Sequence, residues 1–148
     1  LDDLSRGWDE DELAAGRRLV RFYRVQDGNK LIVTAEHMAP QMEYDETDII
    51  VSCIYFDEVD RCCITSVDII HLLERLVDLD FEVDERNRIR RNLEHLKPTT
   101  IAKLSKYSRF FQKLVDFPDP KPRKIEKDIK VFNWVELPRA LNKIISKY

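Results

Sequence analysis

The chain is poor in the residues and runs that mark several large classes of protein. Glycine occurs three times among 148 residues, at Gly7, Gly16 and Gly28, so the sequence has no glycine-rich loop of the kind that holds phosphates or a dinucleotide. No apolar run approaches the roughly 20 residues that a membrane helix needs. We therefore expect neither a nucleotide cofactor nor contact with a membrane.

Cysteine and histidine are also scarce. Three cysteines (Cys53, Cys62 and Cys63) and three scattered histidines show no spacing that is typical of a zinc site. We expect no metal, no cofactor and no catalytic residue, so we do not expect the chain to be an enzyme. The odd number of cysteines favours reduced thiols in an intracellular protein. A hairpin turn at Asp57–Asp60 would bring Cys53 near Cys63, and a disulfide between them is the alternative.

The most informative feature is the distribution of charge. Residues 1–85 carry 22 Asp and Glu against 8 Lys and Arg, a balance of −14, whereas residues 86–148 carry 17 Lys and Arg against 6 Asp and Glu, a balance of +11. The net charge of −3 hides this asymmetry. A concentrated positive field attracts polyanions, which suggests contact with nucleic acid or an acidic partner. The alternative is that the two halves fold together and neutralise each other.

The first half has the patterns of strands. Alternating or continuous apolar residues, with hairpin chemistry at Asp27-Gly28-Asn29, predict two antiparallel hairpins. Their four strands are expected at Arg17–Gln26, Leu31–Glu36, Asp48–Phe56 and Arg61–Ile64.

The second half changes to helical spacing. Thr65-Ser66-Val67-Asp68 has the spacing of a capping box before an apolar helix. Helices are expected at Val67–Asp78, Asp84–Leu96 (with Asp84 as its N-cap), around Phe110–Val115 and at Trp134–Tyr148, and Thr99 or Thr100 is expected to cap a further short turn. Between the last two helices, Phe117–Lys130 is rich in proline and is expected to be extended.

These patterns predict an α+β fold, in which two antiparallel hairpins form a small sheet that is followed by a helical half. Residues 16–148 are expected to form a single domain. Residues 1–15 are expected to be an acidic N-terminal extension, either a short helix or a loose segment. The helix pair beside a sheet is also the arrangement of a winged helix-turn-helix module.

Several long segments resemble one known family. They are Gly16–Phe22, Thr65–Glu74, Asn87–Glu94, Phe117–Trp134 and Leu141–Tyr148, and they occur in the same order along roughly residues 16–148. In these segments the chain resembles the fungal medusa family of developmental regulators. The resemblance implies a nuclear protein that regulates transcription during fungal development, in conidiation, adhesion or morphogenesis. It implies no set of catalytic residues.

The expected helix Asp84–Leu96 is the first candidate for a functional surface. If Ile89 and Leu93 face the core, a set of cations and amides faces outward. Arginine contacts guanine, asparagine contacts adenine, and further cations hold phosphates. The candidate residues for contact with double-stranded DNA on and after this helix are Arg86, Asn87, Arg88, Arg90, Arg91 and Lys97.

The second candidate is the basic, proline-rich strand. An extended backbone keeps its cations apart, which suits contact with successive phosphates. Its candidate residues are Lys121, Arg123, Lys124, Lys127 and Lys130. The favoured interpretation is thus a DNA-binding domain of a nuclear transcriptional regulator, with the acidic sheet free for a coregulator or a second protomer. The alternative is a protein-interaction or self-association domain of the same regulator that makes no direct contact with DNA.

Overall fold

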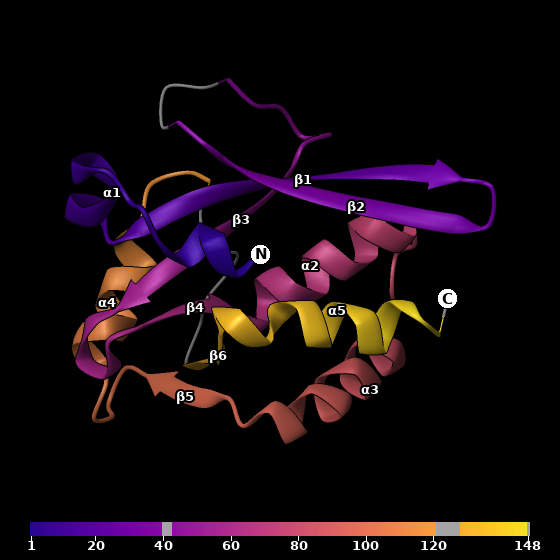
Figure 1. Cartoon of the computed structure of the whole chain (residues 1–148). Helices are drawn as coiled ribbons and strands as arrows, with labels where there is room; N and C mark the ends of the chain where they lie inside the picture. Colours follow the sequence, from indigo (N-terminus) through magenta and orange to yellow (C-terminus); the bar gives the residue numbers. More distant parts are fainter. Residues whose placement is uncertain (40–42, 121–127, 148) are drawn as a thin grey trace.

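An antiparallel sheet of six strands forms the centre of the computed structural model, which describes residues 1–39, 43–120 and 128–147 (Figure 1). The strand order is β2-β1-β3-β4-β6-β5. The strands are β1 (Arg17–Asp27), β2 (Lys30–Met38), β3 (Ile49–Phe56), β4 (Arg61–Thr65), β5 (Thr99–Ala102) and β6 (Asp128–Asn133). The helices are α1 (Glu10–Ala15), α2 (Ser66–Val77), α3 (Val83–Leu93), α4 (Ser108–Asp116) and α5 (Leu137–Ile145). The predicted α+β fold is confirmed.

Both predicted hairpins are present. Strands β1 and β2 pair without interruption from Asp27↔Lys30 to Leu19↔Met38. Gly28 has a φ of 60°, a value that glycine adopts without the steric cost of a Cβ atom and that suits a two-residue hairpin turn. Strands β3 and β4 are joined through a short 3-10 turn at Asp57–Val59. Figure 1 shows that the turn of the first hairpin projects beyond the rest of the sheet.

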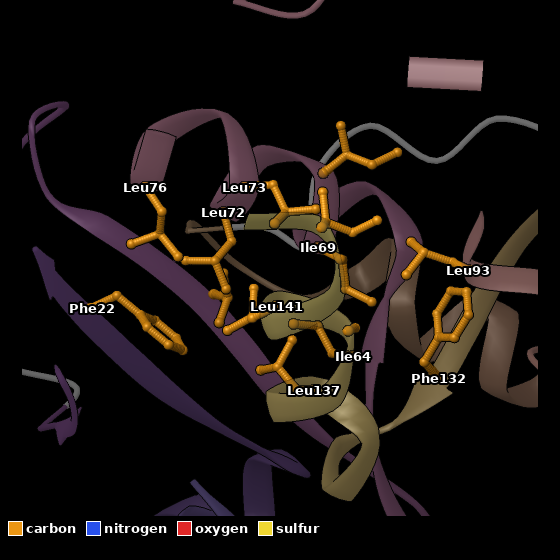
Figure 2. Packing of buried hydrophobic residues seen from close by; sticks show 14 of the residues in the cluster. Phe22, Ile64, Ile69, Leu72, Leu73, Leu76, Leu93, Phe132, Leu137 and Leu141 are labelled. Atoms are coloured by element: carbon orange, nitrogen blue, oxygen red, sulfur yellow. The ribbon is translucent and has the colours of Figure 1, made fainter. Parts of the chain in front are cut away.

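Helices pack against both faces of the sheet. Successive residues of a strand point to opposite faces, so neighbouring residues contact different helices. Cys53 and Ile64 belong to a buried cluster with α2 and α5, whereas their neighbours Ile54 and Cys63 belong to a second cluster with α4. Figure 2 shows the first cluster, in which side chains of α2 and α5 meet those of β1, β4 and β6. The sheet is therefore the middle of three layers.

The start of α2 has the predicted N-cap at Thr65, which is one half of the predicted capping box. The hydroxyl of Thr65 accepts the backbone N–H of Asp68 at 3.2 Å, and the Asp68 carboxylate accepts the backbone N–H of Ser52 at 3.2 Å. The first bond satisfies a free N–H group of the first helical turn. The second ties the beginning of α2 to the adjacent strand β3.

The structure corrects several details of the second half. Thr99 and Thr100 begin strand β5 instead of capping a turn, and β6 pairs with both β4 and β5, so the sheet has two strands more than predicted. Helix α3 begins after Glu82, and Asp84 lies in its first turn, so its prediction as the N-cap is wrong. The last helix is shorter than predicted, because residues 134–136 form a 3-10 turn before α5.

The first fifteen residues form a 3-10 turn and helix α1, and they pack onto the sheet. The indole N–H of Trp134, which is fully buried, donates to the carbonyl of Leu1 at 2.8 Å. The indole N–H of Trp8 donates to the carbonyl of Leu4 at 3.0 Å. The N-terminal segment is thus held near the segment that links β6 to α5.

Candidate functional site

Helix α3 faces the core as the sequence predicts. Ile89 and Leu93 are completely buried, and the polar residues between them lie on the outer side of the helix. Figure 1 shows α3 on the side of the molecule that faces away from the first hairpin. The predicted arginines are therefore at the surface, and their partners decide how much positive charge they present.

Two of the four arginines are held by carboxylates of the protein itself. Arg86 forms an ion pair of 3.4 Å with Glu74 on α2, and Arg88 pairs closely with Glu85 one turn earlier on α3. Neutralised in this way, these two guanidinium groups contribute little to a positive field.

The other predicted residues on this side remain available. Arg90, Arg91, Asn87 and Lys97 are exposed, and Arg90 donates to the side-chain oxygen of Asn87 at 3.1 Å. No carboxylate of the described ranges forms an ion pair with either arginine or with Lys97. Because Arg90 and Arg91 lie in the last turn of α3, they also interact favourably with the helix dipole, so their presence has a structural explanation too.

Only one of the five candidate residues on the predicted basic strand lies within the described structure. Lys121, Arg123, Lys124 and Lys127 fall outside the described residues. Lys130 lies in β6, where its ammonium group contacts the Glu94 carboxylate. The structure therefore brings Lys130 next to the α3 region, but with its charge already paired.

A second surface is formed by the projecting hairpin β1–β2. On the face that points away from α2 and α5, Tyr23, Val25 and Ile32 are 41%, 57% and 44% exposed. Val25 and Ile32 are directly opposite each other, and Tyr23 is the next residue along the same face. Contiguous apolar side chains left in water are typical of surfaces that bind another protein.

Two buried arginines, which the sequence analysis did not single out, anchor peripheral segments to β1. The Arg18 guanidinium contacts the Glu12 carboxylate at 2.7 Å and donates to the carbonyls of Leu4, Arg6 and Gly7 at 2.9–3.3 Å. Burial alone would raise the pKa of Glu12, but the hydrogen bonds and charge of Arg18 hold it below its usual range. This cluster fastens the N-terminal segment.

Arg17 anchors a second segment, the one that follows α4, on the other face of the sheet. Its guanidinium group donates to the Ser52 hydroxyl at 3.2 Å and to the Pro118 carbonyl at 2.8 Å, and it lies 4.7 Å from the centre of the Phe117 ring. Burial lowers the pKa of Arg17. Arg17 and Arg18 thus both hold segments of the chain against β1. The alternation of residues along a strand is the one feature of the sequence that predicts opposite faces for the two side chains.

The three cysteines are free thiols. Cys63 is opposite Ile54 and points to the other face of the sheet from Cys53, so the alternative disulfide between Cys53 and Cys63 is not formed. Cys53 instead lies beside Cys62, and a hydrogen bond from the Cys53 thiol lowers the pKa of Cys62, whereas burial raises the pKa of Cys53 and of Cys63. Cys62 lines a cavity of about 540 Å³ between the N-terminal segment and the segment that links β6 to α5.

Within residues 1–39, 43–120 and 128–147, no group of three or more His, Cys, Asp or Glu side chains has the arrangement of a metal site. The helices in the same ranges are too short or too polar to cross a lipid bilayer.

The chain was compared with known proteins. No curated protein and no solved structure matches it. A family model, described as a domain of unknown function (DUF7082), matches residues 1–145. The match includes the N-terminal segment that Arg18 holds against the sheet. The chain therefore belongs to the DUF7082 family.

Proposed function

We propose that this chain is a protein-interaction domain of a nuclear regulator of gene expression in fungal development. The biological setting rests on the resemblance to the medusa family in five segments of the sequence. The biochemical part rests on the exposed apolar face of hairpin β1–β2, at Tyr23, Val25 and Ile32. A face of this kind costs free energy in water, and burial against a partner removes that cost.

The charge distribution favours protein contact over DNA as the main task. A domain that binds DNA through phosphates is usually strongly basic, whereas this chain has a net charge of −3. Arg86, Arg88 and Lys130 are paired with carboxylates of the same molecule. Glu74 and Glu85 of the acidic half therefore neutralise two cations of the basic half, and Glu94 of the basic half itself neutralises Lys130.

The hairpin surface is tested by changing its apolar residues. The double variant Tyr23→Ser and Val25→Ser is expected to fold, because both side chains are exposed. The unchanged chain is expected to retain a partner protein from an extract of its source cells, and the double variant is expected not to retain it. Leu104→Ser is the matched control, since Leu104 is 96% exposed and lies in the turn after the other edge strand, β5. Quantitative mass spectrometry of the retained proteins is the measurement. Identical profiles for all three chains would contradict the proposal.

Direct contact with duplex DNA is the second candidate function. It is favoured by the exposed set Asn87, Arg90 and Arg91 on the outer face of α3. In this proposal the two arginines contact phosphates or guanine and Asn87 contacts adenine. Lys97 adds a cation at the end of the same segment.

The DNA contact has its own prediction. Replacing Arg90 and Arg91 by alanine is expected to weaken duplex binding about tenfold or more and to reduce the slope of log affinity against log salt by about 2, because two phosphate contacts are lost. Fluorescence anisotropy over a salt series is the measurement. The matched control replaces Arg86 and Arg88, which are already paired with carboxylates, and is expected to have a smaller effect. Absence of binding, or binding that is independent of salt, would remove this candidate.

A further inference from the structure

Strand β2 is an unprotected edge of the sheet. It begins the strand order and pairs only with β1 among the described strands. Exposed edges are usually blunted by proline, by a bulge or by a charge that points inward. Strand β2 has nine residues in continuous register, no proline, and charged residues only near its two ends. The opposite edge, β5, has four residues and follows Pro98.

The register identifies the backbone groups that face outward from this edge. The N–H of Tyr55 donates to the carbonyl of Gly16 at 2.9 Å, so even-numbered residues of β1 bond toward β3 and odd-numbered residues bond toward β2. Tyr23 is opposite Thr34, and even-numbered residues of β2 therefore bond to β1. The N–H and C=O groups of Leu31, Val33 and Ala35 point away from the sheet.

We infer that the partner of this edge is a second copy of the chain, paired antiparallel β2 to β2 about a two-fold axis at Val33. This inference rests on the proposed protein-interaction function and names its partner. An axis at Val33 overlaps the two strands over Lys30–Glu36, and it matches the outward groups of Val33 with each other and those of Leu31 with Ala35. It joins the two sheets into one continuous sheet through an isologous interface.

In this register, the side chains of β2 are complementary in charge and size to those of β2 in the second copy. Lys30 lies opposite Glu36 of the second copy, and each dimer contains this pair twice. Such pairs fall at the non-hydrogen-bonded positions, where side chains approach most closely. On the face toward α5, the large Leu31 lies opposite the small Ala35. The groove of about 280 Å³ between β2 and α5, lined by Leu31, Val33 and Ala35, gives the side chains of the second copy an apolar surface.

The axis is tested by cysteine cross-linking of the full chain. Val33→Cys places two thiols across the axis, where hydrogen-bonded residues have Cα atoms about 5.5 Å apart, which is within the range of a disulfide. Mild oxidation is expected to give a covalent dimer, and mass spectrometry is expected to place the bond at position 33. Leu31→Cys is the matched control, because position 31 of one copy lies opposite position 35 of the other. Equal cross-linking of the two variants would overturn the inference.

The charge pair gives a second test that does not depend on new thiols. Lys30→Glu or Glu36→Lys alone is expected to weaken dimerisation about tenfold or more, because two attractive cross-strand pairs become repulsive. The double exchange is expected to restore it, and a mixture of the two single variants is expected to form heterodimers. Sedimentation equilibrium measures all four cases, with circular dichroism as the control for folding. Lys103 lies just beyond the end of the other edge strand, β5. If Lys103→Glu weakened dimerisation as much as Lys30→Glu does, the inference would be contradicted.

The two proposals fail in different ways. A chain that stays monomeric from micromolar to millimolar concentration overturns self-pairing through β2. If the unchanged chain then still retains a protein that the Tyr23→Ser, Val25→Ser variant does not retain, the interaction function stands, and the partner is another protein. If the serine variant loses nothing, the proposed function itself is wrong.

Discussion

Replacing Arg18 by methionine is expected to lower the free energy of unfolding by about 3–5 kcal/mol, because removing one member of a buried ion pair leaves the other charge without compensation. The Glu12 carboxylate would stay 6% exposed and lose its guanidinium partner. Three backbone carbonyls of the N-terminal segment would lose a donor in the same step. A loss of this size is a large share of the roughly 5–15 kcal/mol that stabilises a typical domain.

Urea unfolding at neutral pH measures this effect, and limited proteolysis reports where the loss begins. The N-terminal segment is expected to become susceptible first, because Arg18 is its main anchor. Arg24→Met, on an exposed part of the same strand, is the control and is expected to change stability by less than about 0.5 kcal/mol. A change below about 1 kcal/mol for Arg18→Met would mean that the segment is held by other contacts.

The ion pair also makes stability depend on pH in a defined direction. Since the pKa of Glu12 is lower in the folded protein than in the unfolded chain, its contribution is complete above the unfolded pKa and is lost as the pH falls through the folded pKa. Glu12→Gln is therefore expected to be less stable than the unchanged chain at neutral pH. The difference between the two chains is expected to shrink in acid.

Replacing Phe110 by alanine is expected to destabilise the protein by about 3–5 kcal/mol, through lost burial and the cavity that remains. The ring is 2% exposed and stacks on Phe56 with ring centres 4.0 Å apart. Helix α4 attaches to the second face of the sheet through this contact and its neighbours. Denaturant unfolding is the measurement, and Leu104→Ala, at an exposed position, is the control. A loss below about 1 kcal/mol would show that α4 contributes little to the second layer.

Local patterns predicted those parts of the fold that are set by neighbouring residues. The turn at Gly28, the cap at Thr65 and the buried side of α3 each depend on residues within one or two turns of the chain. Strand β5 was predicted as a turn, because threonine favours both caps and strands. Its strand conformation comes from pairing with β6, some thirty residues later in the sequence, and no local pattern contains that information.

The candidate site was predictable to the same extent. Burial of Ile89 and Leu93 follows from helical spacing, and so does the outward direction of the arginines. The pair Arg88–Glu85 is also local, since the two residues are three positions apart on one helix. The pair Arg86–Glu74 joins two helices. The sequence between the two residues does not predict that their side chains meet. Neutralisation of Arg86 therefore became visible only in three dimensions.

The position of β6 between β4 and β5 has a consequence for how this protein is made. On the ribosome, the two N-terminal hairpins emerge long before residues 131–133, which pair with Cys63–Thr65. Until then β4 is an open edge of apolar residues, and the nascent chain needs protection from aggregation. Such distant pairing also slows folding. Emergence of β6, more than that of any single turn or helix, therefore sets the moment at which the sheet can be completed.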